Sequence, residues 1–160
     1  MKVMKAALAA LPLLAALLLI PAGANASTLS SGSGSFTATG EVISVQQADG
    51  NTIVTATEVQ TLTGALTGTQ VASGTMTFHP DGTFTAHDTG TSTGSIDGRT
   101  GSITIGGAST GTGTTGTGQI VGDHGTGGLA GLHLQGTFQP TITSATTAEG
   151  TYSIQFHFGA

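Results

Sequence analysis

The sequence predicts an all-β domain, an eight-stranded antiparallel closed barrel, that follows an export signal. Three observations lead to this fold: alternating Thr-rich segments punctuated by glycine, three Asp-Gly turns, and an apolar N-terminal segment with a positively charged start. The chain has 27 glycines in 160 residues. Because glycine, threonine and valine all disfavour helices, we expect strands and tight turns throughout the mature chain.

The N-terminal segment has the pattern of a secretory signal peptide. Lys2 and Lys5 precede an apolar run over residues 6–20, and a small-residue cleavage site ends at Ala26. We expect cleavage there, a single domain over residues 27–160, and a secreted or periplasmic protein. A retained membrane helix is the alternative, which the short run disfavours.

Charge and cysteine content exclude several kinds of partner and site. Outside the expected signal, Arg99 is the only Lys or Arg, and the chain has eight Asp and Glu. This balance excludes nucleic-acid binding by phosphate neutralisation and disfavours an anionic membrane surface. The chain has no cysteine, which excludes disulfides, a thiol nucleophile and Cys-ligated zinc. We expect a soluble exported protein with no membrane insertion after cleavage.

Alternating segments between turn residues predict eight strands. The predicted strands cover residues 36–47, 52–62, 66–78, 83–96, 102–110, 116–121, 129–138 and 150–158. The Asp-Gly pairs that begin at Asp49, Asp81 and Asp97 predict tight hairpins. Short connections between successive antiparallel strands favour a closed barrel, which leaves no exposed edge, whereas a two-layer sandwich is the alternative.

The alternation also predicts which side chains face the interior. Gly68, Ala72 and Gly74 share this face with larger residues, so part of the inner wall is small. An eight-stranded barrel is wide enough for its own side chains or for one small ligand. We therefore expect a ligand-sized cavity, with a completely filled interior as the alternative. The predicted ligand-binding residues are Met76, Phe78, Phe84, Tyr152, Ile154 and Phe156.

Glu58 is the candidate catalytic residue, although the pattern leaves its orientation open. If Val54 and Leu62 point inward, Glu58 lies inside an apolar barrel with a raised pKa and can act as a general acid or base. If it points outward, it is solvated or pairs with Arg99. Whether the protein is an enzyme stays open at this point.

Two further patterns, the spacing of His79 and His87 and the glycines of residues 111–116, do not predict a metal or cofactor site. If a three-residue loop closes the hairpin at Asp81, then His79 pairs with Thr83 and His87 lies opposite Thr75. This separates the two imidazoles by roughly 13 Å, too far to share one zinc ion. Residues 111–116 spell a dinucleotide-binding fingerprint, but the motif requires a following helix. We expect neither metal nor cofactor.

Three glycine-containing segments resemble the DUF3224 family of small bacterial proteins, which is placed with allene oxide cyclase-like barrels. They are the turn at 80–82, the segment 97–102, and the glycine pattern at 125–132 with Gly-Thr-Phe at 136–138. The glycine pattern is also similar to one in dirigent proteins. The resemblance covers about residues 64–158 and implies an eight-stranded antiparallel barrel with an apolar cavity.

Three classes of function follow from this sequence. The first is binding of a small apolar or amphipathic molecule inside the barrel. The second is an isomerase or cyclase resembling allene oxide cyclase, in which Glu58 moves a proton. The third is a non-catalytic structural or interaction protein with a solid barrel. A homo-oligomer is compatible with all three.

Overall fold

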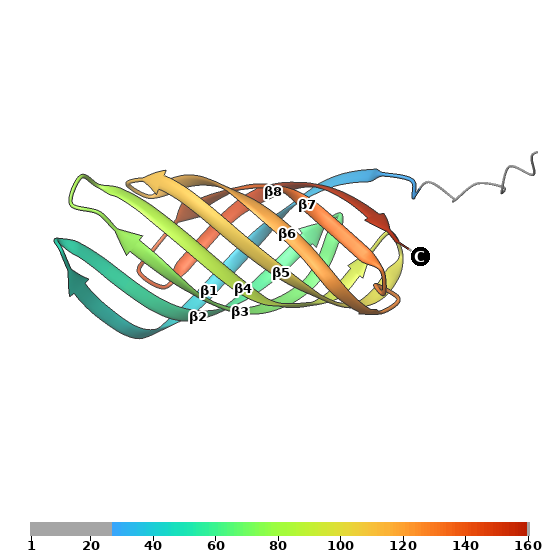
Figure 1. Cartoon of the computed structure of the whole chain (residues 1–160), viewed down its shortest axis with the longest axis horizontal. Coiled ribbons are helices and arrows are strands. Elements are labelled where there is room, and N and C mark those ends of the chain that lie inside the picture. Colours follow the sequence, from blue (N-terminus) through green and yellow to red (C-terminus); the bar gives the residue numbers. More distant parts are fainter. Residues whose placement is uncertain (1–26, 160) are drawn as a thin grey trace, which may run out of the picture.

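The computed structural model describes residues 27–159. Eight strands pair antiparallel in chain order, and the last pairs with the first, which closes the sheet into a barrel (Figure 1). This confirms the predicted all-β ring and excludes the two-layer sandwich. The expected signal, residues 1–26, lies outside the described residues. The strands are β1 Ser30–Ala48, β2 Asn51–Gly64, β3 Leu66–Phe78, β4 Thr83–Ile96, β5 Arg99–Thr112, β6 Thr115–Gly127, β7 Leu132–Ile142 and β8 Thr147–Phe158.

The bounds of β3 and β4 agree with the predicted strands, while the other strands differ at their ends. The prediction was wrong for the start of β7, because Leu129 belongs to the preceding turn. Its N–H donates to the Thr126 carbonyl at 3.0 Å, and its own carbonyl accepts from the Leu132 N–H at 3.0 Å. Among residues 27–159 no helix has the length and apolar character needed to cross a bilayer.

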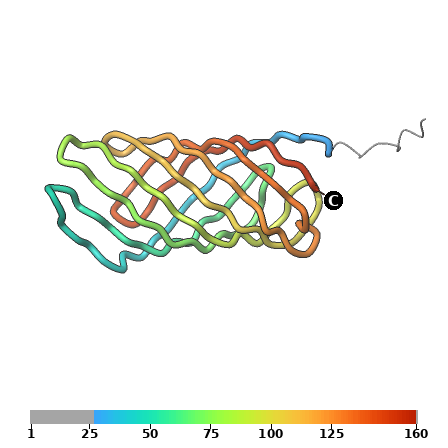
Figure 2. The backbone as a smooth tube through the Cα atoms, in the orientation of Figure 1, coloured from blue at the N-terminus to red at the C-terminus, as the bar shows by residue number. Residues whose placement is uncertain are grey.

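The two ends of the barrel differ. One end, the hairpin end, carries the β1–β2, β3–β4, β5–β6 and β7–β8 connections, and the other carries the remaining connections and both termini of the described chain (Figures 1 and 2). Pairing of β1 with β8 stops at Thr39, so residues 41–48 pair with β2 alone. The β1–β2 hairpin therefore projects beyond the closed part of the barrel.

The end opposite the hairpin end, called the sealed end below, is closed by apolar side chains. Ile96, Ile103, Leu129 and Leu132 are fully buried there and belong to one core cluster. Some inward positions near the hairpin end, such as Val54 and Met76, are only half-buried, although Phe84 is buried there.

Glycines of the inner wall are covered by large side chains from neighbouring strands. A Cβ at Gly150, for example, would lie 2.7 Å from the Phe36 ring. Register places a ring or a branched side chain over each of these glycines, whereas Gly68 and Gly74, from which space was expected, lie closest to backbone atoms of β4. The covered pairs are Gly150 with Phe36, Gly34 with Tyr152, Gly111 with Phe84, Gly118 with Phe138 and Gly122 with Leu134.

Tyr152 fixes the turn between β2 and β3. Its hydroxyl accepts from the Leu66 N–H at 2.9 Å and lies 2.9 Å from the carbonyl oxygens of Thr63 and Leu66, to which it donates its proton. Burial raises the pKa of the phenol, which is therefore neutral.

The variant Tyr152→Phe is expected to lower the free energy of unfolding by about 1–3 kcal/mol, because it leaves the buried Leu66 N–H without a partner. Urea unfolding followed by circular dichroism measures this change. An unchanged unfolding midpoint would show that the phenol does not hold this turn.

Candidate functional site

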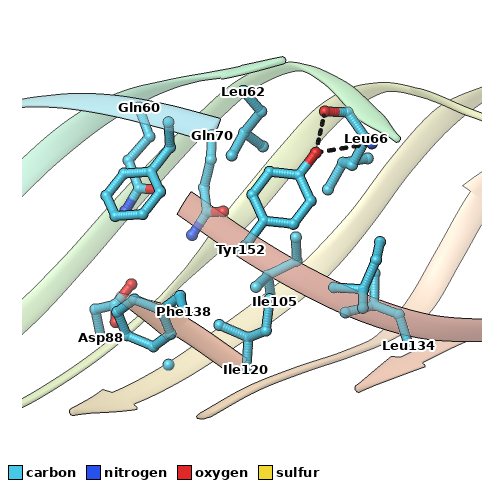
Figure 3. A pocket seen from close by; sticks show the side chains of 13 residues that line it. Gln60, Leu62, Leu66, Gln70, Asp88, Ile105, Ile120, Leu134, Phe138 and Tyr152 are labelled. Carbon is cyan, nitrogen blue, oxygen red and sulfur yellow. Dashed lines mark hydrogen bonds between the residues drawn. The ribbon is translucent and has the colours of Figure 1, made fainter. Parts of the chain in front are cut away.

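A cavity of about 60 Å³ lies inside the barrel between the hairpin end and the sealed end. Small-molecule pockets are commonly about 300–1,000 Å³, so this cavity is small. Its two sides differ in chemistry (Figure 3): Leu66, Ile105 and Leu134 form an apolar side, while Gln60, Gln70 and Asp88 gather at the other. The cavity is therefore amphipathic.

The polar side arises from the register of three adjacent strands. Gln60 on β2 pairs with Gln70 on β3, which pairs with Ser92 on β4. All three residues occupy inward positions, so they form a polar row across the inner wall. Gln70 and Ser92 are buried, and the Ser92 hydroxyl has no hydrogen-bond partner among the described residues.

Gln70 is the most unusual member of this row. Its side chain is only 3% exposed, and it lines the cavity with its carboxamide directed into it (Figure 3). Gln60, by contrast, donates to Glu58. A carboxamide can both donate and accept hydrogen bonds, so Gln70 is a group that could bind the polar part of a molecule held in the cavity.

Asp88 lies closer to the hairpin end. It pairs with Gly74 and Gly107, and its carboxylate occupies the space beside Gly107, where a Cβ would lie 2.6 Å from Oδ1. Burial, and secondarily the charge of Glu58, raise the pKa of Asp88 to about 6, and His87 opposes this shift. Asp88 is therefore a partly buried carboxyl group that titrates close to neutral pH.

Glu58 lies on the inward-facing side of β2, the same side as Val54 and the buried Leu62. It is half-buried, accepts a hydrogen bond from Gln60 and interacts electrostatically with Asp88. Of the two orientations left open by the sequence, the inward one is found. Glu58 does not itself line the cavity but lies on its hairpin-end side.

The structure separates the six predicted ligand-binding residues. Tyr152 and Ile154 line the cavity. The other four lie elsewhere: Phe156 packs edge-on against Phe158 at the sealed end, Phe84 is buried beside Phe78, and Met76 is half-buried near the hairpin end. Phe78 is 36% exposed.

Sequence reasoning missed the polar residues Gln60, Gln70 and Asp88. A signal for them was present, because Asp88 continues the inward set of Phe84 and Ala86, and Gln70 shares its face with Ala72 and Gly74. Polar residues at inward positions of an otherwise apolar wall are the signal that could have found them.

The histidines do not form a metal centre in the described part of the chain, where no three or more metal-binding side chains gather. The predicted register is confirmed, because the His79 N–H donates to the Thr83 carbonyl at 2.9 Å and His87 pairs with Thr75. Asp81 stabilises this hairpin by accepting from the Thr83 N–H at 2.9 Å and from the Thr83 hydroxyl at 2.7 Å. These hydrogen bonds lower the pKa of Asp81.

Comparison with known proteins supports the fold and gives no activity. The family model described as "Protein of unknown function (DUF3224)" matches residues 30–157. A crystal structure of a protein of unknown function from this family, from Shewanella oneidensis MR-1, is similar to the barrel with a TM-score of 0.62 and 19% identity. The match covers 84% of this chain and 99% of that one. No curated protein matches the chain.

Proposed function

The chain belongs to the DUF3224 family of proteins of unknown function, and we propose that its barrel binds one small amphipathic molecule in the cavity. The observation that carries this proposal is Gln70, whose side chain is 3% exposed and whose carboxamide is directed into the cavity that it lines (Figure 3). A polar group of the ligand would bind this carboxamide, and the apolar part of the ligand would lie against Ile105, Ile120 and Leu134.

The size of the cavity limits the ligand. About 60 Å³ accommodates only a few non-hydrogen atoms, since even a benzene-binding cavity measures about 150 Å³. A longer molecule would have to extend toward the hairpin end, past the half-buried Glu58 and Met76.

Native mass spectrometry of the gently purified protein tests this proposal. The wild-type protein is expected to retain a small molecule, and Gln70→Leu to lose it. Gln139→Leu, at an exposed position of β7, is the matched control and is expected to retain it. Equal retention by Gln70→Leu would show that Gln70 does not hold the ligand. No retained mass in any sample, together with no binding of added small molecules, would favour a solid structural barrel.

The same variant makes a stability prediction. Gln70→Leu is expected to raise the free energy of unfolding of the ligand-free protein by about 1–3 kcal/mol, because an apolar side chain of similar size replaces a buried amide. Thermal unfolding of the two proteins measures the difference. A lower melting temperature for the variant would mean that the amide is well satisfied in the folded state.

Proton-transfer catalysis is the second candidate, favoured by the raised pKa of Asp88 next to Glu58. A carboxyl group that titrates near pH 6 exchanges protons readily under ordinary conditions. An isomerase or cyclase resembling allene oxide cyclase would use this pair, but a cavity of about 60 Å³ does not enclose a long flexible substrate. The test is whether a retained molecule is isomerised by the wild-type protein and not by Asp88→Asn or Glu58→Gln.

Either of these functions would take place outside the cytoplasm. We propose that residues 1–26 direct the chain out of the cytoplasm and are removed after Ala26, in keeping with their charge and apolar pattern. Intact-mass measurement of the protein from a secreting host would give a chain beginning at Ser27. A mass that includes Met1 would contradict this.

A further inference from the structure

We infer that the ligand of this cavity is a short primary amine in its protonated form, with the ammonium group held by Asp88 and the Gln70 carboxamide oxygen, and with Glu58 adding negative charge from the hairpin-end side. The alkyl chain would occupy the apolar side. This inference rests on the proposed function, of which it names the ligand class, and it follows from the charges that surround the polar side of the cavity.

The inner wall carries negative charge that no basic side chain offsets. Asp88 and Glu58 both occupy inward positions and interact with each other. Within residues 27–159 the only Lys or Arg is Arg99, and its guanidinium lies 3.9 Å from the centroid of the Phe158 ring, near the sealed end. A partly buried carboxylate without a positive partner is unfavourable, and a bound cation would relieve that cost.

The hydrogen-bonding groups on the polar side also match an ammonium group. An ammonium has three N–H donors and no acceptor, whereas carboxylates accept only. Gln60 already donates to Glu58, while the carboxamide of Gln70 is directed into the cavity, where its oxygen can accept (Figure 3). An alcohol has only one donor, and a carboxylate ligand would be repelled by Asp88. The arrangement therefore favours an ammonium over either of these groups.

A metal ion fits this site less well than an ammonium. Calcium takes six to eight oxygen ligands and magnesium a near-ideal octahedron, whereas the polar side of the cavity offers one carboxylate and two carboxamides. The rest of the lining is apolar, with Phe138 beside Asp88 and Tyr152 and Ile105 beyond it (Figure 3). No group of three or more metal-binding side chains occurs in the described residues. An apolar wall suits an alkyl chain.

A matched series of n-propylamine, n-propanol and propionate tests the inference. Each compound is titrated at pH 7 into the protein, with methyl resonances of the cavity residues Ile105, Ile120 and Leu134 followed by NMR. Propylamine is expected to bind at least about tenfold more tightly than propanol, because hydrogen bonds to charged groups are roughly twice as strong as neutral ones. Propionate is expected to bind most weakly.

Variants identify the group that recognises the cation. Asp88→Asn is expected to weaken propylamine binding about tenfold or more while leaving propanol binding nearly unchanged. Asp97→Asn is the matched control and is expected to change neither, because Asp97 is exposed in the turn between β4 and β5. Its φ of 51° is also tolerated by asparagine.

The pH dependence gives an independent readout. Propylamine affinity is expected to fall as the pH drops through about 6, the pKa of Asp88, because protonation removes the negative charge. The titratable groups that act on Asp88 are Glu58 on β2 and His87 on its own strand. Protonation of Glu58 or of His87 also makes the local charge around Asp88 less negative.

The outcomes separate the two proposals. If propanol or propionate binds as tightly as propylamine, or if Asp88→Asn leaves propylamine binding intact, the amine inference is overturned while binding in the cavity stands. If none of the three compounds shifts the cavity resonances and the purified protein retains no small molecule, both the inference and the proposed function are overturned.

Discussion

Replacement of Leu129 by alanine is expected to lower the free energy of unfolding by about 2–5 kcal/mol, the range for leucine-to-alanine changes in buried cores. Leu129 is 0% exposed and packs in the cluster that closes the sealed end, with Ile96, Ile103 and Leu132. Its position in a turn held by backbone hydrogen bonds to Thr126 and Leu132 restricts collapse of the surroundings into the new space. The cost should therefore lie in the upper part of the range.

Urea unfolding monitored by circular dichroism measures this effect. Leu29→Ala is the matched control, because Leu29 is 60% exposed before the first strand, and its unfolding midpoint is expected to stay the same. A loss of less than about 1 kcal/mol for Leu129→Ala would mean that the sealed end repacks freely. In that case the sealed end would not be a rigid boundary of the cavity.

Stability should also depend on pH through Asp88. The usual carboxyl pKa of 3.8 applies to the unfolded chain, and burial with the charge of Glu58 raises it to about 6 in the folded protein. Between these values the folded state keeps a proton that the unfolded state has lost. The contribution of this group to the free energy of unfolding is fully present below pH 4 and is lost as the pH rises through 6. The loss is up to about 3 kcal/mol, and screening by solvent at this partly buried carboxyl group reduces it.

Asp88→Asn removes this dependence. The variant is expected to unfold at a higher denaturant concentration than the wild type at pH 8 and at nearly the same concentration at pH 4, because asparagine stays neutral. Urea titrations at the two pH values, with Asp97→Asn as the exposed control, measure the difference. A wild-type protein that is more stable than Asp88→Asn at pH 8 would show that the carboxylate is stabilised by its surroundings.

Asp88 and Gln70 together indicate that the inner wall is not optimised for the stability of the folded protein. Each is expected to be less favourable for folding than an uncharged or apolar residue of similar size. Functional sites commonly hold groups of this kind, because the geometry that binds a ligand is rarely the geometry that stabilises the chain. At the sealed end the largest fully buried side chains are aliphatic, although the unpartnered Ser92 hydroxyl lies on β4 opposite Ile103.

The sequence by itself determined that there are eight strands and the face that many of their side chains occupy, although it left the orientation of Glu58 open. Alternation predicted β3 and β4 with their observed bounds and placed Phe84 and Tyr152 inside, because side chains alternate strictly along a strand. The Asp-Gly turns predicted the hairpins, since glycine accepts positive φ at Gly50, Gly82 and Gly98. These properties are local, so they can be inferred without knowing which strands pair.

Only the tertiary structure decided where space remains inside the barrel. Gly118 and Gly150 lie on the inner wall, yet Phe138 and Phe36 cover them, because register across the sheet sets which side chain lies opposite each glycine. The same register brings Gln60, Gln70 and Ser92 into one row and Asp88 close to Glu58. These contacts join residues far apart in the chain, and closure of the ring fixes them.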